Sequence, residues 1–434
     1  MARKNDAAAL LGHVGLAACA WMMTSQPVFA QSPANAADTN RADQDIIVTA
    51  NKREESINRV GLTIRAIGSE DLNRQQIRSL QDVAQAVPSL TFSQTEQSTP
   101  VYTLRGIGFY DTSLASYPTV SVYVDQAPLP FPTLTTLTAF DLERIEVLKG
   151  PQGILFGNNA TGGAINYIAA KPTKELSAGG SLSYGRFSTV AADGFVSGPL
   201  TSNLLGRVSF SLTKGSGYQI SVTRPKDRND APDTLAGRVL LAWTPTDRLK
   251  VDINLNGWRD RSEPSAGQFV VYQPTFAPTP VNGPFIPNAT SNNRVADWSP
   301  DFPPSADNRL YQAAVRADYD LTDDVVLTSL TSYIDYKHDQ VPEGDGLAKH
   351  RNDIDYNRGY IKSFSQELRI ANNSSTVFRW LAGANYSHDR VYEDNCRLSR
   401  FYHGQQSRLP RLEGQWLLRE AAHDQLCGVR EWRV

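Results

Sequence analysis

The sequence predicts a small mixed α/β domain followed by antiparallel transmembrane β-barrel strands, with the barrel incomplete in this chain. Three observations favour this class: an export signal, a turn-rich motif at residues 144–166, and long alternating segments after Lys171. Alternation of apolar and polar residues with a period of two indicates strands whose two faces meet different environments. The 17 Tyr, 16 Phe and 7 Trp suit β-structure with aromatic side chains at a membrane interface.

Residues 1–30 are predicted to be a secretory signal peptide. Arg3 and Lys4 give a positive start, residues 10–20 are almost wholly apolar, and residues 28–30 (Val-Phe-Ala) offer a cleavage site. The alternative is an N-terminal membrane anchor, but a spanning helix needs about 20 apolar residues. We therefore expect export and leave this segment out of the fold.

Residues 31–55 are predicted to be a flexible lead that contains one short β-prone segment. Up to Gln44 the lead is rich in Ala, Asn, Asp and Ser and has no periodicity. The segment that interrupts it consists of Asp45, Ile46, Ile47, Val48, Thr49 and Ala50. Such a segment can add a strand to the sheet edge of a partner protein. The alternative is that it is simply the first strand of the next domain.

Residues 56–172 are predicted to form the mixed α/β domain. Residues 82–90 suggest a short helix that stops at Pro88, and Asp71 with Leu72, Ile77 and Leu80 suggests another that Ser69 caps. Two short strands are expected at residues 102–108 and 120–125. The motif at residues 144–166 then reads as a strand, a Gly-Pro turn, a short apolar piece and a Gly-Gly turn before a second apolar run.

The order of these pieces resembles the plug domain of TonB-dependent outer-membrane receptors over about 120 residues. The resemblance rests on Arg144-Ile-Glu-Val-Leu-Lys-Gly-Pro-Gln-Gly-Ile-Leu-Phe156, on Gly157-Asn-Asn-Ala-Thr-Gly-Gly-Ala-Ile-Asn166, and on the earlier segments in their order. It implies that residues 45–50 are the TonB box, the segment that binds TonB. It also implies transport across the outer membrane rather than catalysis.

Residues 173–391 are predicted to be part of the barrel. Leu249, Val251, Ile253 and Leu255 alternate with polar residues, as do residues 313–319 and 380–386. Apolar-out, polar-in strands of about ten residues are typical of an outer-membrane barrel. Short connections at residues 244–248, 321–324 and 371–375 are expected in the periplasm, and the long connection at residues 259–308, without a strand pattern, outside the cell. A soluble β-sandwich would also alternate.

The barrel is expected to be incomplete. We count roughly nine candidate strands, whereas plugged outer-membrane transporters have about 22. From Cys396 onward alternation is lost, and the sequence ends in Arg433-Val434 instead of a terminal aromatic residue. We interpret residues 392–434 as an aberrant or non-barrel tail, produced for example by a frameshift, on a truncated receptor. Cys396 and Cys427 are the only cysteines after the signal, so no disulfide framework is expected.

Chemical motifs are missing from the sequence. The six His residues have no metal-ligand spacing, the Gly-rich run lacks the ending of a phosphate loop, and no G-x-S-x-G elbow occurs. We therefore expect no enzyme activity, no metal and no cofactor. A formal net charge of −2 gives no case for nucleic-acid binding.

The resemblance also implies an ionic lock between plug and barrel. Arg105 and Lys149 match basic plug residues of the family, and Glu367 matches a lumenal barrel carboxylate, because alternation turns it away from Leu368 and Ile370. Lys149 stands where Arg is more frequent, and a Lys cannot form a bidentate pair. The alternative is that the three are ordinary solvated charges on a wet wall.

The function that the resemblance implies is energy-coupled uptake through the bacterial outer membrane. The expected partners are TonB with its inner-membrane energising complex, outer-membrane lipid and a small-molecule ligand. A ferric siderophore is the favoured ligand; vitamin B12, an oligosaccharide or an aromatic compound are the alternatives. Two other classes stay open: a truncated receptor fragment that does not transport, and a secreted β-rich binding or enzymatic protein.

Overall fold

The computed structural model describes residues 46–75, 77, 80–95, 97–157, 159–268, 291–348, 352–372, 378–399, 417–418 and 425–433. The expected signal peptide and the first part of the expected lead, through Asp45, lie outside these residues. The chain from Ile46 onward forms one compact unit. None of the helices in the described part of the chain has the length and apolar character that crossing a bilayer demands.

The N-terminal domain of this unit is built on a five-stranded sheet. Its strand order is β3-β8-β9-β6-β7; β6 and β9 run parallel and the other neighbours antiparallel. The strands are β3 (Ile64–Gly68), β6 (Val120–Val124), β7 (Ala127–Leu129), β8 (Leu142–Lys149) and β9 (Gly163–Ala169). Gly163 has φ +149, and a Cβ there would lie 2.2 Å from the Leu148 carbonyl oxygen. The Gly-Gly turn of the motif thus requires glycine at this position.

Short elements complete this domain. They are the two-stranded pair β1 (Ile47–Val48) and β2 (Glu55–Ser56), the hairpin β4 (Leu90–Gln94) and β5 (Pro100–Leu104), the helices α1 (Ser69–Arg74), α2 (Leu80–Ala86) and α3 (Gly153–Phe156), and the 3-10 turns η1 (Ile57–Arg59) and η2 (Pro132–Thr135). The α2 helix ends just before Pro88, as expected. The predicted cap was wrong: Gly68 is the N-cap of α1 and Ser69 is its first helical residue.

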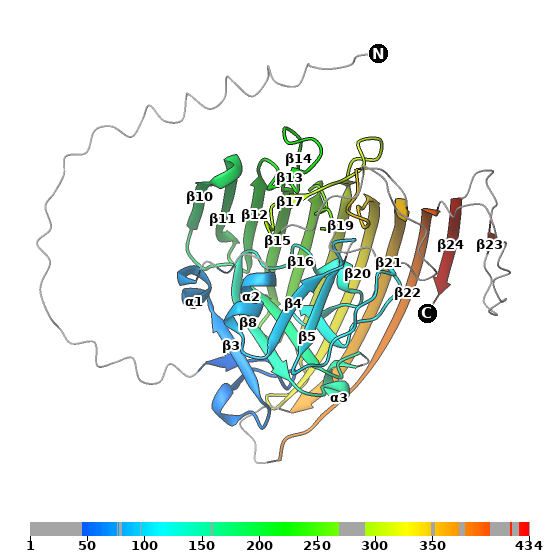
Figure 1. The fold of residues 1–434 in the computed structure, drawn as a ribbon. Helices are drawn as coiled ribbons and strands as arrows, with labels where there is room; N and C mark the ends of the chain where they lie inside the picture. The colour runs from blue at the N-terminus through cyan, green and yellow to red at the C-terminus, as the bar shows by residue number, and fades with distance from the viewer. Residues whose placement is uncertain are drawn as a thin grey trace, which may run out of the picture. The chain divides into compact units, whose positions relative to one another are not determined.

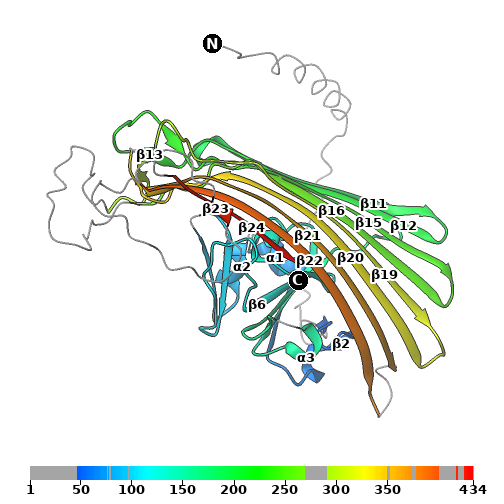
Figure 2. The ribbon, with the colours of Figure 1, turned by 90° about the vertical axis from the view of Figure 1, so that its right-hand side faces the viewer.

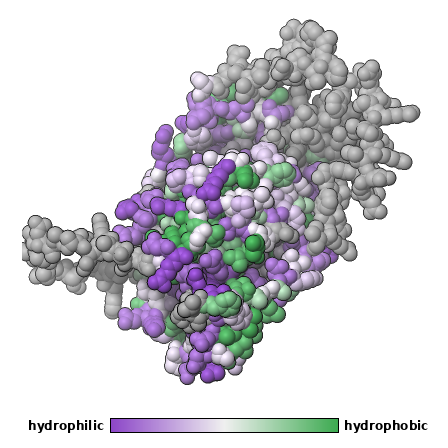
Figure 3. Space-filling model, turned by 90° about the horizontal axis from the view of Figure 1, so that it is seen from below, coloured by the Kyte–Doolittle hydropathy of each residue, from purple (hydrophilic) through white to green (hydrophobic). Residues whose placement is uncertain are grey.

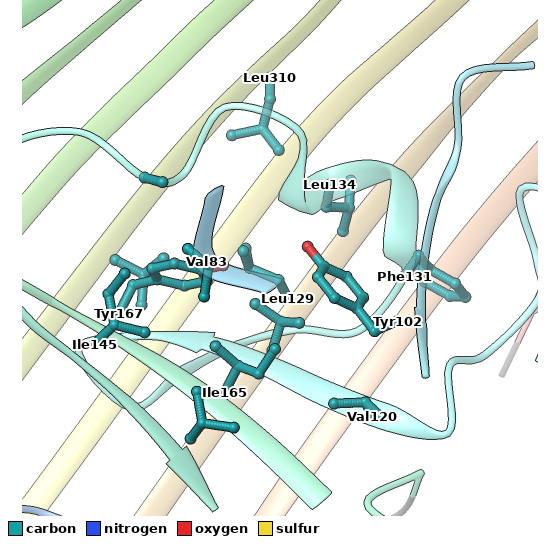
Figure 4. Close-up of a cluster of buried hydrophobic side chains, with 14 of the residues drawn as sticks. Val83, Tyr102, Val120, Leu129, Phe131, Leu134, Ile145, Ile165, Tyr167 and Leu310 are labelled. Carbon is teal, nitrogen blue, oxygen red and sulfur yellow. The ribbon is translucent and has the colours of Figure 1, made fainter. Parts of the chain in front are cut away.

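The hydrophobic core of the domain continues into the wall strands that follow it. Figure 4 shows its side chains, among them Val83 from α2, Tyr167 from β9 and Leu310 from the wall strand β19 (Asn308–Asp320). Tyr167 is fully buried and Leu310 is 1% exposed. The small domain and the wall therefore share packed apolar contacts and do not merely meet through charges.

The second part of the chain is a long, curved antiparallel sheet (Figures 1 and 2). The strand order is β10-β11-β12-β15-β16-β19-β20-β21-β22-β24-β23, and β18 pairs with β20. Its strands are β10 (Ser177–Gly185), β11 (Thr189–Thr201), β12 (Leu204–Lys214), β15 (Asp233–Thr246), β16 (Leu249–Asp260), β18 (Ser305–Ala306), β19 (Asn308–Asp320), β20 (Val325–Val341), β21 (Asn352–Asn372), β22 (Leu381–Ser399), β23 (Leu417–Leu418) and β24 (Gln425–Arg433). The 3-10 turn η3 (Arg186–Ser188) joins β10 to β11. Nine long strands between Ser177 and Ser399 agree with the predicted number.

The two faces of this sheet have the burial pattern of a membrane wall. On the face away from the small domain, Val208, Tyr311 and Leu368 are 56%, 63% and 49% exposed. Their polar neighbours on the other face, such as Arg207 and Arg369, are buried. A β-sandwich would bury its apolar face, so the pattern argues against the sandwich alternative and for a wall whose apolar face meets lipid.

Two expectations about the second part of the chain were wrong. The expected end of the barrel part at residue 391 falls inside β22, and β24, from the predicted non-barrel tail, pairs with β22. Cys396 lies opposite Cys427 in this pairing and is disulfide-bonded. The long connection expected to lack strands contains β17 (Val295–Ala296), which joins β13 (Gln219–Ser221) and β14 (Arg228–Asn229) in a small sheet.

Candidate functional site

The predicted partner-binding segment is docked on the small domain. Its described part, residues 46–50, is called the coupling segment below. The Thr49 backbone N–H donates to both carboxylate oxygens of Glu146, at 2.9 and 3.0 Å, and the Thr49 hydroxyl donates to Glu146 Oε2 at 2.9 Å. Glu146 lies on β8, inside the motif that the sequence singled out, and is fully buried. One carboxylate therefore fixes the segment through three hydrogen bonds.

Further side chains orient this carboxylate and its partner. Arg144 Nε donates to Glu146 Oε1 at 2.8 Å, so the buried negative charge has a cationic partner. Asn166 Nδ2 donates to the Thr49 hydroxyl at 3.2 Å, and Asn166 Oδ1 accepts the Gln126 N–H at 3.1 Å. Charge-assisted hydrogen bonds of this kind are stronger than neutral ones. The network is built into the sheet, and the coupling segment completes it.

The coupling segment has an accessible end and a buried end. Ile46 and Ile47 are about half exposed, whereas Val48 and Ala50 are fully buried. Ile47–Val48 forms β1 and pairs with β2, as the first-strand alternative predicted. The expectation of a flexible lead up to residue 55 was therefore wrong for residues 46–55, because Glu146 and β2 hold them in place. The predicted member Asp45 lies outside the described residues.

Glu367 faces the small domain as predicted, but its partner there is Lys52. Lys52 Nζ lies 3.2 Å from Glu367 Oε2, and Arg369 lies 2.9 Å from Glu367 Oε1. Lys52 Nζ also lies over the rings of Phe156 and Tyr123, at 4.9 and 5.5 Å from their centroids. Burial lowers the pKa of Lys52 from its ordinary value of 10.5, and the Glu367 charge acts to raise it.

The expected pairing of Arg105 and Lys149 with Glu367 does not occur among the described contacts. Lys149 Nζ donates to the Pro88 carbonyl at 2.7 Å, and the Arg105 backbone N–H donates to the Ser89 carbonyl at 2.9 Å. Both therefore bind the turn between α2 and β4. Burial, followed by the nearby Arg105 charge, lowers the pKa of Lys149. Among the described contacts, the basic partners of Glu367 are Lys52 and Arg369.

The wall also supplies two arginines that bind Phe140 and Asp141 of the small domain, and the sequence analysis missed both. Arg207 on β12 binds Asp141 through two guanidinium nitrogens, one of them at 2.8 Å. Arg238 on β15 donates to the Phe140 carbonyl at 2.9 Å and lies over the Phe140 ring. Both arginines occupy polar positions of alternating strands, and this is the signal that could have found them.

A cavity of about 660 Å³ adjoins the coupling segment. Thr49, Lys52 and Arg144 line it from the small domain, while Arg316 and Asp318 line it from the wall. Figure 3 shows the molecule from the side of α3, where hydrophilic and hydrophobic surface are interspersed. Charged side chains of the small domain and of the wall thus line the same cavity.

A second cavity, of about 390 Å³, lies among the long connections and is called the outer cavity below. Gln94, Ser98 and Thr136 line it from the small domain. The wall contributes residues from η3, from the β12–β15 and β16–β19 connections and from the end of β20; among these are Phe187, Tyr218, Asp230, Glu263 and Gln340. Within the described residues, no group of three or more His, Cys, Asp or Glu could hold a metal ion.

Comparison with known proteins agrees with this architecture. The sequence profile of the TonB-dependent receptor plug domain matches residues 56–164. The iron-regulated outer membrane virulence protein of Vibrio cholerae is 30% identical over 208 residues, which are 44% of this chain and 30% of that protein. The chain thus matches less than a third of the length of this curated relative.

Solved structures share the fold over a longer stretch. The ferric yersiniabactin uptake receptor FyuA of Yersinia pestis has a TM-score of 0.64 at 18% identity, over 78% of this chain and 50% of that one. The ferripyoverdine receptor of Pseudomonas aeruginosa, solved with ferripyoverdine bound, has a TM-score of 0.65 at 17% identity, over 82% and 46%. The chain thus carries a TonB-dependent receptor plug domain at residues 56–164, and the wall strands that follow it share the fold of these solved receptors.

Proposed function

We propose that the chain serves TonB-coupled uptake of a small ligand across the bacterial outer membrane. The observation that supports this most is the burial pattern of the wall. Its apolar side chains face outward, and its polar side chains bind a plug domain through Lys52–Glu367 and Arg207–Asp141. A wall that meets lipid on one face and holds a movable plug on the other could let a ligand cross the membrane when the plug moves.

The coupling segment is the proposed binding site for TonB. Ile46 and Ile47 are exposed, and β1 has a paired neighbour on one side only in its two-stranded sheet. A partner strand could therefore pair with β1 through main-chain hydrogen bonds. The bonds from Thr49 to Glu146 hold the rest of the segment to β8. Pulling on the segment would load β8 and the plug sheet, and this is how force from the energised inner membrane would reach the plug.

A ferric siderophore is the proposed ligand class. The two solved relatives are named for ferric yersiniabactin and ferripyoverdine, and the curated relative is named as iron-regulated. Vitamin B12, an oligosaccharide or an aromatic compound are the alternatives. The outer cavity, between the plug and the long connections, is the proposed entry site. The proposed mechanism needs no catalytic step and no cofactor of the protein's own.

Uptake in cells that lack their own receptors tests this function. The chain is expressed with its leader in such cells, with TonB and without it, and accumulation of radio-iron-labelled siderophores is measured. We expect accumulation only where TonB and the chain are both present, and loss of accumulation with Ile47→Pro. Accumulation that is independent of TonB, or none for any siderophore, vitamin B12 or oligosaccharide, contradicts the proposal.

A further inference from the structure

The charge of the outer cavity is one-sided. Among the described residues that line it, three are carboxylates, Asp230, Asp260 and Glu263, and none is Lys or Arg. The other lining residues are neutral: Gln94, Ser98, Thr136, Phe187, Thr189, Ser216, Tyr218, Pro232, Ser262, Pro264, Ser265, Ala306 and Gln340. An anionic ligand would meet repulsion from these three carboxylates.

The carboxylates lie in surroundings that do not neutralise them fully. Burial raises the pKa of Asp230; a hydrogen bond with Ser265 acts against this, and the nearby Glu263 charge adds to it. Burial also raises the pKa of Glu263, whose Oε2 accepts the Ala231 N–H at 3.2 Å. A cation that enters beside these two carboxylates would favour the charged form of both.

Gln340 supplies an independent sign of a missing donor. Its side chain is 3% exposed and lines the cavity, and its Oε1 has no hydrogen-bond partner. A buried carbonyl without a donor destabilises the protein. A ligand N–H or O–H that reached this oxygen would remove that penalty.

The remaining lining favours an organic ligand over a bare metal ion. Phe187 and Tyr218 pack edge to face with centroids 5.4 Å apart, and both rings line the cavity. The described residues contain no cluster of three or more His, Cys, Asp or Glu that could hold a metal. The Arg294 guanidinium already lies over both rings, at 4.7 and 5.4 Å from their centroids, so the charge of an organic cation would go to the carboxylates and its carbon skeleton to the remaining apolar lining.

We propose that the outer cavity binds the positively charged, hydrogen-bond-donating end of an organic ligand, such as an ammonium or guanidinium group, and disfavours multiply anionic ligands. This inference rests on the proposed function and narrows its ligand class. Among ferric chelates it selects those that carry a free amine and disfavours tris-catecholate complexes, whose iron centre is strongly anionic.

Binding to the full chain in outer-membrane vesicles tests the inference. The two probes are a radio-iron-labelled trihydroxamate chelate with a free ammonium group and a radio-iron-labelled tris-catecholate chelate. We expect the ammonium-bearing chelate to bind at least about tenfold more tightly, a difference of about 1.4 kcal/mol. Raising the salt concentration should weaken its binding.

Three variants and a control separate binding from folding. Asp230→Asn and Glu263→Gln should each weaken binding of the ammonium-bearing chelate about tenfold. Gln340→Met should weaken it too, and because it removes an unpartnered buried oxygen it should not destabilise the fold. The control, Asp323→Asn, removes an equal charge from a carboxylate that is 98% exposed in a short turn, and should change nothing.

The outcomes distinguish this inference from the proposed function. The inference is overturned if the tris-catecholate chelate binds equally or more tightly, or if all three variants bind as the unaltered chain does. Neither result contradicts the proposed uptake function. If the chain binds neither chelate and supports no TonB-dependent uptake of any ligand, the proposed function fails, and the inference fails with it.

Discussion

Thr49 and Glu146 lie 97 positions apart in the sequence, yet three hydrogen bonds of 2.9 to 3.0 Å join them. The donor residue belongs to the coupling segment, and the acceptor belongs to the central part of the plug sheet. Glu146 also accepts from Arg144 and is fully buried. The segment that we propose for TonB is thus attached to the plug at one carboxylate, and this contact sets both its stability and its release.

Thr49→Val removes the hydroxyl and keeps the shape. The change deletes the hydroxyl bond to Glu146 and leaves Asn166 without its acceptor, so we expect the segment to loosen by about 1–2 kcal/mol. Backbone amides of residues 46–52 should then exchange with deuterium about tenfold faster. Thr63→Val is the control, since Thr63 is exposed. Equal exchange in the two variants would show that the hydroxyl does not hold the segment.

Glu146→Gln removes the charge that Thr49 and Arg144 share. One amide oxygen replaces two charged acceptor atoms, so we expect a loss of about 2 kcal/mol in the free energy of unfolding. Glu143→Gln is the matched control, because Glu143 also binds Arg144 but is 39% exposed. Denaturant unfolding measures both. If Glu143→Gln lowers the free energy of unfolding as much as Glu146→Gln does, the loss comes from the contact with Arg144 and not from the contact with the coupling segment.

Glu367→Gln should have an effect that depends on pH through Lys52. The pKa of Lys52 in the fold lies below its ordinary 10.5, so the unfolded chain binds the proton more tightly and stability rises with pH between the two values. Removing Glu367 lowers the folded pKa further. We therefore expect the variant to be destabilised most near neutral pH. Its stability should approach that of the unaltered chain as the pH approaches the pKa of Lys52 in the unfolded chain.

Unfolding midpoints from neutral pH to about pH 10 check this expectation. Asp339→Asn is the control, because it breaks the exposed pair with Arg358 and leaves Lys52 untouched. A destabilisation by Glu367→Gln that stays constant across this range would mean that Lys52 and Glu367 do not share a proton-linked contact.

Arg207→Lys should weaken the hold of the wall on the plug. Arg207 binds both oxygens of Asp141 and lies 3.7 Å from the ring centroid of Phe195, and a lysine cannot reproduce the two parallel bonds. We expect the plug to become accessible to protease at a lower urea concentration. Arg248→Lys, in an exposed pair 3.7 Å from Asp323, should leave the urea profile unchanged. If protease cleaves the plug at the same urea concentration in both variants, Arg207 does not hold the plug as we propose.

Much of the fold follows from local pattern. Alternation at Leu249 to Leu255 predicted β16 because each strand has one face toward lipid and one toward the plug. The Pro88 stop and the Gly-Gly turn were predicted correctly, because both depend on backbone geometry that a short segment determines. The partner of Glu367 could not be predicted this way. Lys52 and Lys149 are both plug lysines, and only the tertiary fold decides which one reaches the wall.

The tail shows another limit of local pattern. Residues 425–433 have no clear alternation, yet they pair with β22, because main-chain hydrogen bonds form a strand wherever a neighbouring edge is available. The attachment of the coupling segment was missed for a similar reason. Nothing near Glu146 in the sequence shows that its carboxylate meets Thr49.

Binding of the periplasmic domain of TonB to the chain in outer-membrane vesicles tests the central claim most directly. We predict saturable binding to the unaltered chain, tighter binding to Glu146→Gln because the segment is already released, and no binding to Ile47→Pro because proline removes the main-chain donor and disfavours strand pairing. Binding to Ile47→Pro that matches the unaltered chain would contradict the assignment of residues 46–50 as the coupling segment.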